Sequence, residues 1–134
     1  MSQTVVERTA LENGILDVCQ QGINTWQEAF NRQDAAGCAG QYTEGSVMEA
    51  RPFGTFTGRA EIQAFWQGIM DQGYREVEYS DVKWQQADDG PGYILTSSWT
   101  MNKAFGVVHK EHWIVETDGK ARLISDVFEI QGER

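Results

Sequence analysis

Residues 107–131 read VVHKEHWIVETDGKARLISDVFEIQ, and this stretch decides the expected fold. Two alternating runs, rich in β-branched and aromatic residues, flank Asp118-Gly119, a pair that favours the tight turn of a β-hairpin. A two-residue loop would pair Thr117 with Lys120 and so set the register of both strands. The sequence therefore predicts an antiparallel hairpin at this end of the chain.

The expected register places two acidic side chains directly opposite each other. The predicted pairs on one face are Glu111 with Asp126, His109 with Phe128, Trp113 with Ile124, and Val115 with Arg122. Opposed side chains on antiparallel strands have Cβ atoms about 4.5–5.5 Å apart, which brings the two carboxyl groups within hydrogen-bonding reach. Two full charges about 4 Å apart at an effective dielectric constant of about 20 repel by about 4 kcal/mol, or about 3 pKa units. A shared proton, a cation or a protonated His109 would relieve this repulsion, so the pair is a candidate acid/base site.

Other interpretations of this pair stay open at the level of sequence. The two carboxylates could point apart into solvent, and a three-residue loop would shift the register by one residue. His109 could be an ordinary surface or core histidine. A metal held by His109, Glu111 and Asp126 is chemically possible, but the chain has no compact metal motif and no nucleotide-binding or hydrolase motif. We therefore expect no metal and no cofactor.

The rest of the chain predicts helices first and strands afterwards. Apolar spacing and turn residues predict helices over 11–30, 34–42 and 57–73, a brief strand over 46–50, and strands over 74–86, 93–104, 107–117 and 121–131. The breaks at 88–92, near Gly106 and at Asp118-Gly119 are short, so the last four strands form an antiparallel meander. This order predicts an α+β fold whose helices cover one face of a curved sheet.

Size and charge limit the class of protein. The chain has 134 residues, 40% of them hydrophobic, which fits a single globular domain. Its net charge of −9 opposes binding to nucleic acid and to anionic membranes. Without a basic leader or a membrane-spanning apolar stretch, we expect a cytoplasmic protein. Cys19 and Cys38 lack metal-ligand spacing and are expected to be buried thiols.

Five tryptophans in a chain of this length are a separate signal, because tryptophan serves mainly where large flat surfaces pack or bind. Core packing explains most of them, but the same aromatic residues also describe a pocket for an apolar small molecule. The residues expected to line it are Trp26, Trp66, Trp99, Trp113, Met48, Phe53 and Phe128.

Segments at 26–42, 51–54 and 58–66, together with the hairpin around Asp118-Gly119, occur in an order that resembles the nuclear transport factor 2-like superfamily, in its SnoaL-like and ketosteroid isomerase-like branch. The resemblance covers about residues 15–131 and leaves 1–14 as an N-terminal helical extension of a single domain over 1–134. It implies a cystatin-like cone, in which a curved antiparallel sheet wraps around the N-terminal helices and encloses a deep hydrophobic pocket. It also implies a homodimer through the outer sheet face, which here would carry Lys110, His112, Ile114, Leu123, Ser125 and Val127.

The resemblance implies that this chain keeps only part of the ketosteroid isomerase active site. Ketosteroid isomerases place a hydrogen-bond-donating carboxylic acid where this chain has Glu111, whereas their tyrosine donor falls near Trp26. Their proton-shuttling aspartate falls near Ala50 or Arg51, so that base is missing and the same steroid reaction is not expected. Asp126 is the candidate replacement base, with Tyr42 or Trp66 as a further donor.

These observations predict a small cofactor-free acid/base enzyme of the isomerase, dehydratase or cyclase type. Its substrate would be a hydrophobic carbonyl or polyketide-like small molecule. Glu111 would be the neutral acid, Asp126 the base, and His109 a tuner or second proton carrier. The alternative is a non-catalytic module of the same fold that binds a small apolar ligand or assembles subunits.

Overall fold

The computed structural model describes the backbone of residues 5–88 and 91–134 and, within these ranges, the side chains from residue 14 onward. The elements in chain order are α1 (Val5–Asn31), α2 (Ala35–Ala39), β1 (Tyr42–Arg51), β2 (Gly54–Thr57), α3 (Arg59–Asp71), β3 (Glu78–Gln86), β4 (Tyr93–Thr100), β5 (Ala104–Val115) and β6 (Ala121–Glu133). The expected α+β order is confirmed. Residues 1–4 of the expected extension over 1–14, and residues 89–90 of the expected break at 88–92, lie outside the described residues.

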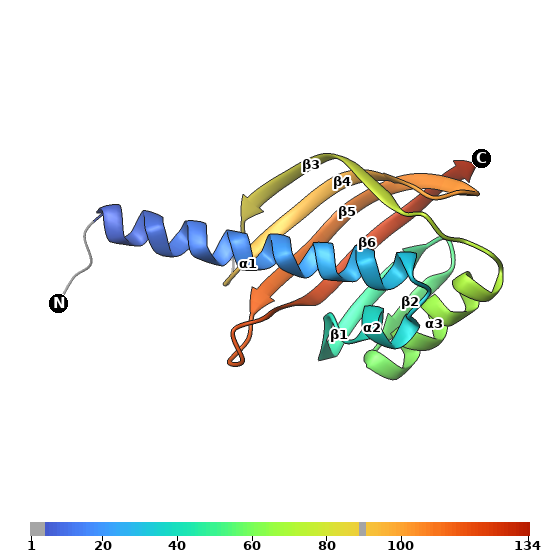
Figure 1. The fold of residues 1–134 in the computed structure, drawn as a ribbon, viewed down its shortest axis with the longest axis horizontal. Coiled ribbons are helices and arrows are strands. Elements are labelled where there is room, and N and C mark those ends of the chain that lie inside the picture. Colours follow the sequence, from blue (N-terminus) through green and yellow to red (C-terminus); the bar gives the residue numbers. More distant parts are fainter. Residues whose placement is uncertain (1–4, 89–90) are drawn as a thin grey trace.

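The strands form one curved, open sheet in the order β2-β1-β6-β5-β4-β3 (Figure 1). The expected antiparallel meander from β3 to β6 is confirmed. Two features differ from the expectation, because β1 pairs in parallel with β6, and β2 forms a strand where only a turn was predicted. No local signal indicates the parallel pairing, since the chain between β1 and β6 includes α3 and four other strands.

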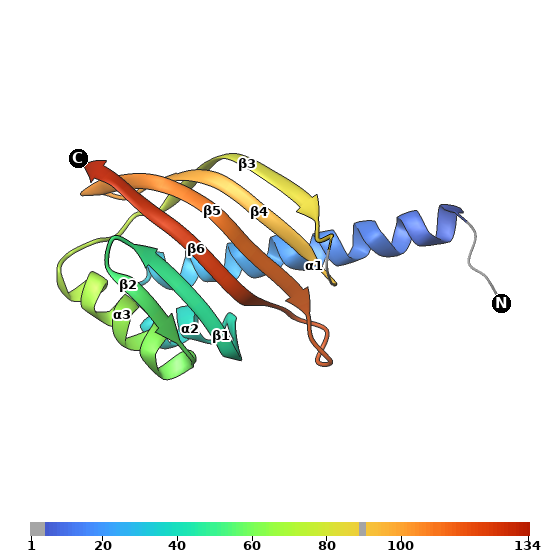
Figure 2. The same cartoon turned by 180° about the vertical axis from the view of Figure 1, so that it is seen from behind.

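The helices cover the concave face of the sheet (Figures 1 and 2). α1 crosses this face, whereas α2 and α3 pack together beside β1 and β2. The buried stripe of α1 has the expected helical spacing and consists of Cys19, Ile23, Trp26, Ala29 and Phe30. In both views the N-terminal part of α1 extends beyond the sheet. No helix in the described part of the chain is long and apolar enough to cross a membrane.

The last hairpin has a longer loop than the sequence predicted. The Glu116 N–H donates to the Lys120 carbonyl oxygen at 2.9 Å, and the Gly119 N–H donates to the Glu116 carbonyl oxygen at 2.9 Å. The loop therefore has three residues, and the pairs nearest to it are displaced by one. Trp113 pairs with Leu123, whereas the two-residue loop predicted Ile124 as its partner.

A β-bulge in β6 compensates for this displacement. The register shifts between His112 and Trp113, and beyond that point Glu111 pairs with Asp126, as predicted. A bulge inserts one extra residue, so it offsets a one-residue error in the loop. The pairing of the two acids is thus confirmed, although the loop from which it was inferred was wrong.

The same bulge changes the outer face of the hairpin. Leu123, expected on that face, is 1% exposed and belongs to the core. His112 is also buried, and its Nε2 lies 2.9 Å from the carbonyl oxygen of Pro91. The expected dimer surface therefore lacks two of its six residues, and dimerisation stays a prediction.

Gly22 allows α1 to approach β5 closely. A Cβ atom at this position would lie 2.7 Å from Cζ3 of Trp113, whose side chain is fully buried. A Cβ atom at Gly14, in the same helix, would meet nothing within 4 Å. The two glycines therefore differ in their packing although both lie in the same helix.

We predict that alanine has opposite effects at these two glycines. Gly14→Ala should stabilise the protein by about 0.5–1 kcal/mol, because alanine favours the helix. Gly22→Ala should destabilise it by about 1–3 kcal/mol, because the added methyl group overpacks a rigid indole ring. Urea unfolding followed by circular dichroism measures both changes, and equal stabilisation by the two substitutions would contradict the close contact.

Candidate functional site

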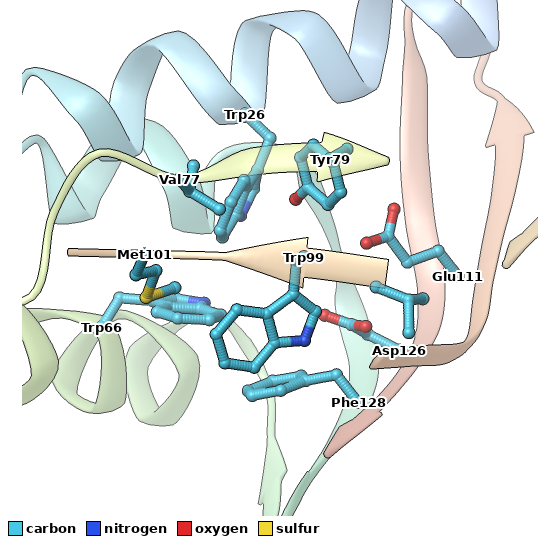
Figure 3. A pocket seen from close by; sticks show the side chains of 10 residues that line it. Trp26, Trp66, Val77, Tyr79, Trp99, Met101, Glu111, Asp126 and Phe128 are labelled. Atoms are coloured by element: carbon cyan, nitrogen blue, oxygen red, sulfur yellow. The ribbon is translucent and has the colours of Figure 1, made fainter. Parts of the chain in front are cut away.

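A cavity of about 30 Å³ lies between α1, α3 and the inner face of the sheet (Figure 3). A single water needs about 10–15 Å³, so the cavity has room for about two water molecules. The residues that line it are Trp26, Trp66, Val77, Tyr79, Trp99, Met101, Val108, Glu111, Asp126 and Phe128. Figure 3 shows the Glu111 and Asp126 side chains next to each other at one side of this mainly aromatic lining.

Each buried acid accepts a hydrogen bond from a neutral donor. Glu111 and Asp126 are both 4% exposed. The Trp113 indole N–H donates to Glu111 Oε1 at 2.9 Å, and the Tyr42 hydroxyl donates to Asp126 Oδ2 at 2.7 Å. In the described part of the chain neither acid forms a salt bridge. The two groups are therefore buried without a positive charge to balance them.

Burial shifts the pKa values of both acids upward. Desolvation raises the pKa of Glu111 well above its usual range, the charge of Asp126 raises it further, and the hydrogen bond from Trp113 opposes the rise. Desolvation raises the pKa of Asp126 to about 7, although the hydrogen bond from Tyr42 lowers it. The two groups interact strongly, so they titrate as a pair. The pair holds at least one proton at neutral pH.

Several polar atoms of the cavity lining have no hydrogen-bond partner among the described residues. They include the indole N–H groups of Trp26 and Trp99 and the Oδ1 atom of Asp126. The Trp66 indole N–H also has no partner of normal hydrogen-bond geometry. Burial and the charge of nearby Asp126 raise the pKa of the Tyr42 hydroxyl well above its usual value, and the Trp66 N–H only partly opposes this rise. An unpaired buried polar group costs about 1–3 kcal/mol. Their concentration at one cavity indicates a place for water or for a ligand oxygen.

The structure brings most of the predicted site residues to this cavity. Trp26, Trp66, Trp99 and Phe128 line it together with the two acids. Tyr42, Met48 and Trp113 are fully buried behind it, where Tyr42 and Trp113 bind the acids and the Met48 sulfur lies 3.6 Å from the Tyr42 hydroxyl.

Phe53 does not reach the cavity. Its side chain is 55% exposed, and its ring packs against Phe65 with centroids 5.7 Å apart. The prediction that it lines the pocket was wrong, because Phe53 lies in the connection between β1 and β2 at the edge of the sheet.

His109 also lies outside the cavity, contrary to the prediction that it shares a face with Glu111. The register of β5 shifts between Val108 and Lys110, so His109 is the extra residue of a bulge. Val108 takes the inner position, whereas His109 is exposed and its Nε2 lies 2.8 Å from Glu129 Oε1. The three metal ligands considered for the sequence are therefore not brought together. Among the described residues no group of three or more His, Cys, Asp or Glu side chains is placed to hold a metal ion.

Sequence reasoning missed Tyr79 as a lining residue. Tyr79 pairs directly with Trp99 on the neighbouring strand, so both side chains face the same side of the sheet. Trp99 was predicted to face inward, and cross-strand pairing of β3 with β4 would have found Tyr79. Burial and the charges of Glu111 and Asp126 raise the pKa of Tyr79 well above its usual value, so its hydroxyl stays neutral.

Comparisons with known proteins reveal similar chains. The sequence model of the SnoaL-like domain matches residues 23–130. A search of curated protein sequences finds no match. Among solved structures, this chain is similar to ActVI-ORFA from Streptomyces coelicolor, with 18% identity over 87% of this chain and 97% of that one and a TM-score of 0.72.

Two further solved structures have the same fold. A putative scytalone dehydratase from Novosphingobium aromaticivorans is 11% identical over 89% of this chain and 85% of that one, with a TM-score of 0.71. Nuclear transport factor 2 from Cryptosporidium parvum is 15% identical over 86% of this chain and 93% of that one, with a TM-score of 0.70. At these identities the similarity establishes the fold alone.

We predict that the protein becomes less stable as the pH rises from about 5 to 8. Carboxyl groups of an unfolded chain have pKa values of about 4, whereas burial raises the folded-state pKa values of Glu111 and Asp126. The folded state therefore binds more protons in this window, and the free energy of unfolding falls as they are lost. The decrease is at most about 1.4 kcal/mol per pH unit for each group.

Urea unfolding at a series of pH values measures this slope. Asp126→Asn should flatten it, because the amide does not titrate. Glu28→Gln removes an exposed acid of α1 and serves as the matched control, with a slope equal to that of the parent. An identical slope in Asp126→Asn and the parent would contradict the raised pKa.

Proposed function

This chain belongs to the SnoaL-like domain family, within the nuclear transport factor 2-like superfamily that its sequence resembles, and we propose that it is a cofactor-free enzyme that moves a proton on a neutral, apolar carbonyl compound. The reaction is an isomerisation, dehydration or cyclisation. One observation carries the proposal: Glu111 and Asp126 are buried opposite each other at an aromatic cavity, without a salt bridge in the described part of the chain.

The stability cost of this arrangement supports a functional role. Buried acids in a purely structural setting are normally paired with cations or coordinate a metal. Here the donors are a phenol and an indole, which satisfy one oxygen of each acid and leave both pKa values raised. Acid/base catalysts need pKa values near the working pH, and such shifts cluster at active sites.

The hydrogen bonds support a different role for each acid. Because Trp113 donates to Oε1 of Glu111, the proton of the neutral acid resides on Oε2 and is available to a substrate oxygen. Because Tyr42 donates to Oδ2 of Asp126, the unpartnered Oδ1 is the atom that removes a proton from the carbon beside the carbonyl group. A positioned acid or base of this kind accelerates a reaction by about 10²–10⁴-fold.

The indole N–H groups of Trp26 and Trp99 complete the site. They are buried donors without partners in the described residues, and a carbonyl oxygen that becomes negative in the transition state would accept hydrogen bonds from them. The fold of this chain is also that of a putative scytalone dehydratase, which supports a dehydratase among the reaction types, although a fold by itself does not determine chemistry.

A different observation favours a second function. The cavity volume is about 30 Å³, whereas pockets for drug-sized ligands measure about 300–1,000 Å³. A non-catalytic domain that assembles copies of itself, or that binds a very small apolar ligand, needs no larger space. We keep this function as the alternative.

We predict that the protein exchanges the hydrogen atoms beside the carbonyl group of apolar ketones with solvent. Proton NMR of a panel of neutral ketones incubated with the protein in heavy water detects this exchange, and the natural substrate need not be known. Asp126→Asn should slow exchange by about 10²–10⁴-fold, because the base is lost. Glu111→Gln should slow it less, because the amide still donates a hydrogen bond.

Glu129→Gln is the matched control, since Glu129 lies on the same strand as Asp126 but pairs with His109 on the outer face. Exchange in this variant should equal that of the parent. Ketones that bind to the protein without any exchange would contradict the enzymatic function and favour the alternative.

A further inference from the structure

A second, larger space lies outside the cavity. α1 and β3 border a groove of about 510 Å³. Its apolar lining includes Ile23, Val82, Trp84 and Leu95, and Gln20 and Asn24 add side-chain amides. Unlike the cavity, this groove falls within the size range of small-molecule sites, about 300–1,000 Å³.

Tyr79 separates the two spaces. Among the described residues it is the one that both linings share. Its ring lies edge-on to Trp26, with centroids 6.4 Å apart, and its backbone pairs with Trp99. Trp26 and Trp99, two of the indoles with unpartnered N–H groups, are thus both neighbours of Tyr79.

The Tyr79 side chain can move without the loss of a hydrogen bond. Within the described residues no hydrogen bond holds its hydroxyl group. β3 is an edge strand, bonded only to β4, and most of its residues are exposed. Rotation of the ring therefore costs packing against Trp26 but no buried polar contact.

The backbone on both sides of Tyr79 localises this motion. Val77 is fixed to α1, because its N–H donates to Asn31 Oδ1 at 2.7 Å and its carbonyl oxygen accepts from Gln27 Nε2 at 3.0 Å. Beyond Tyr79 the register of β3 shifts between Ser80 and Lys83. The hydrogen bonds of Val77 hold the strand on one side of Tyr79, whereas on the other side its pairing with β4 is irregular.

We propose that Tyr79 is a gate between the groove and the cavity, and that the groove holds the ring system of the substrate while its carbonyl group passes Tyr79 to reach Glu111 and Asp126. This inference rests on the proposed function. The ligand is a flat, neutral, largely apolar ring compound with a carbonyl group at one end. Glu78 is the charged residue of the groove within the described part of the chain, so the lining offers no cation to an acidic ligand.

The size of the two spaces explains why a gate is needed. A cavity of about 30 Å³ admits a carbonyl oxygen but not a ring. When a ligand binds only to an open state, its apparent affinity and its association rate fall with the population of that state. Removal of the Tyr79 ring should therefore raise both the association rate and the apparent affinity of the ligand.

The test uses naphthyl methyl ketone as a neutral probe and follows the indole N–H resonances of Trp26, Trp84 and Trp99 by NMR. In the parent, the probe should shift the resonance of Trp84 in the groove and those of Trp26 and Trp99 in the cavity. Tyr79→Ala should accelerate association by at least about tenfold. Gln85→Ala is the control, because Gln85 is an exposed residue of the same strand that belongs to neither lining, and its association rate should stay near that of the parent.

Two results would overturn the gate. One is an unchanged association rate in Tyr79→Ala, and the other is a shift of Trp84 alone in both the parent and Tyr79→Ala. If Tyr79→Ala does not fold, Tyr79→Leu gives the same measurement with more of the side chain retained. The carbonyl group of the probe should still reach the cavity in Asp126→Asn, because passage of the gate does not require catalysis. A lack of catalysis by the parent therefore contradicts the proposed function without contradicting the gate.

Discussion

The burial of two opposed carboxyl groups without a cation is the constraint on which the rest of this structure depends. Glu111 and Asp126 face each other across β5 and β6, and neither has a salt bridge in the described chain. Such a pair is stable only with a bound proton and with neutral donors at fixed positions. The fold supplies both donors, since Tyr42 comes from β1, the neighbour of β6, and Trp113 lies on β5 two residues from Glu111.

The mixed sheet makes this support possible. Because β1 lies in parallel beside β6, Met48 pairs with Asp126 and Tyr42 starts the same strand. An entirely antiparallel meander would place no strand on that side of Asp126. The helices then cover the acids with indole rings, which exclude most of the water and leave a space for only about two molecules. The low polarity of this cover keeps the pKa values of both acids high.

The molecule thus gives up stability at one place in its core. Raised acid pKa values and unpartnered indole N–H groups both oppose folding, and both occur around one cavity. Residues that strain a fold in this way are more common at functional sites than elsewhere. The larger groove beside Tyr79 gives this small, strained centre a connection to a space of ligand size.

Local patterns predict every element except β2, together with their order, because helical spacing in α1 and alternation in β3 to β6 are properties of neighbouring residues. The sequence also determined the pairing of Glu111 with Asp126, although through a two-residue loop that does not form. Only the three-dimensional arrangement reveals the parallel contact of β1 with β6 and the exposure of His109, whereas the inward position of Tyr79 follows from its pairing with Trp99. A bulge displaces every following side chain by one position, and its site depends on packing between distant segments that no local pattern reports.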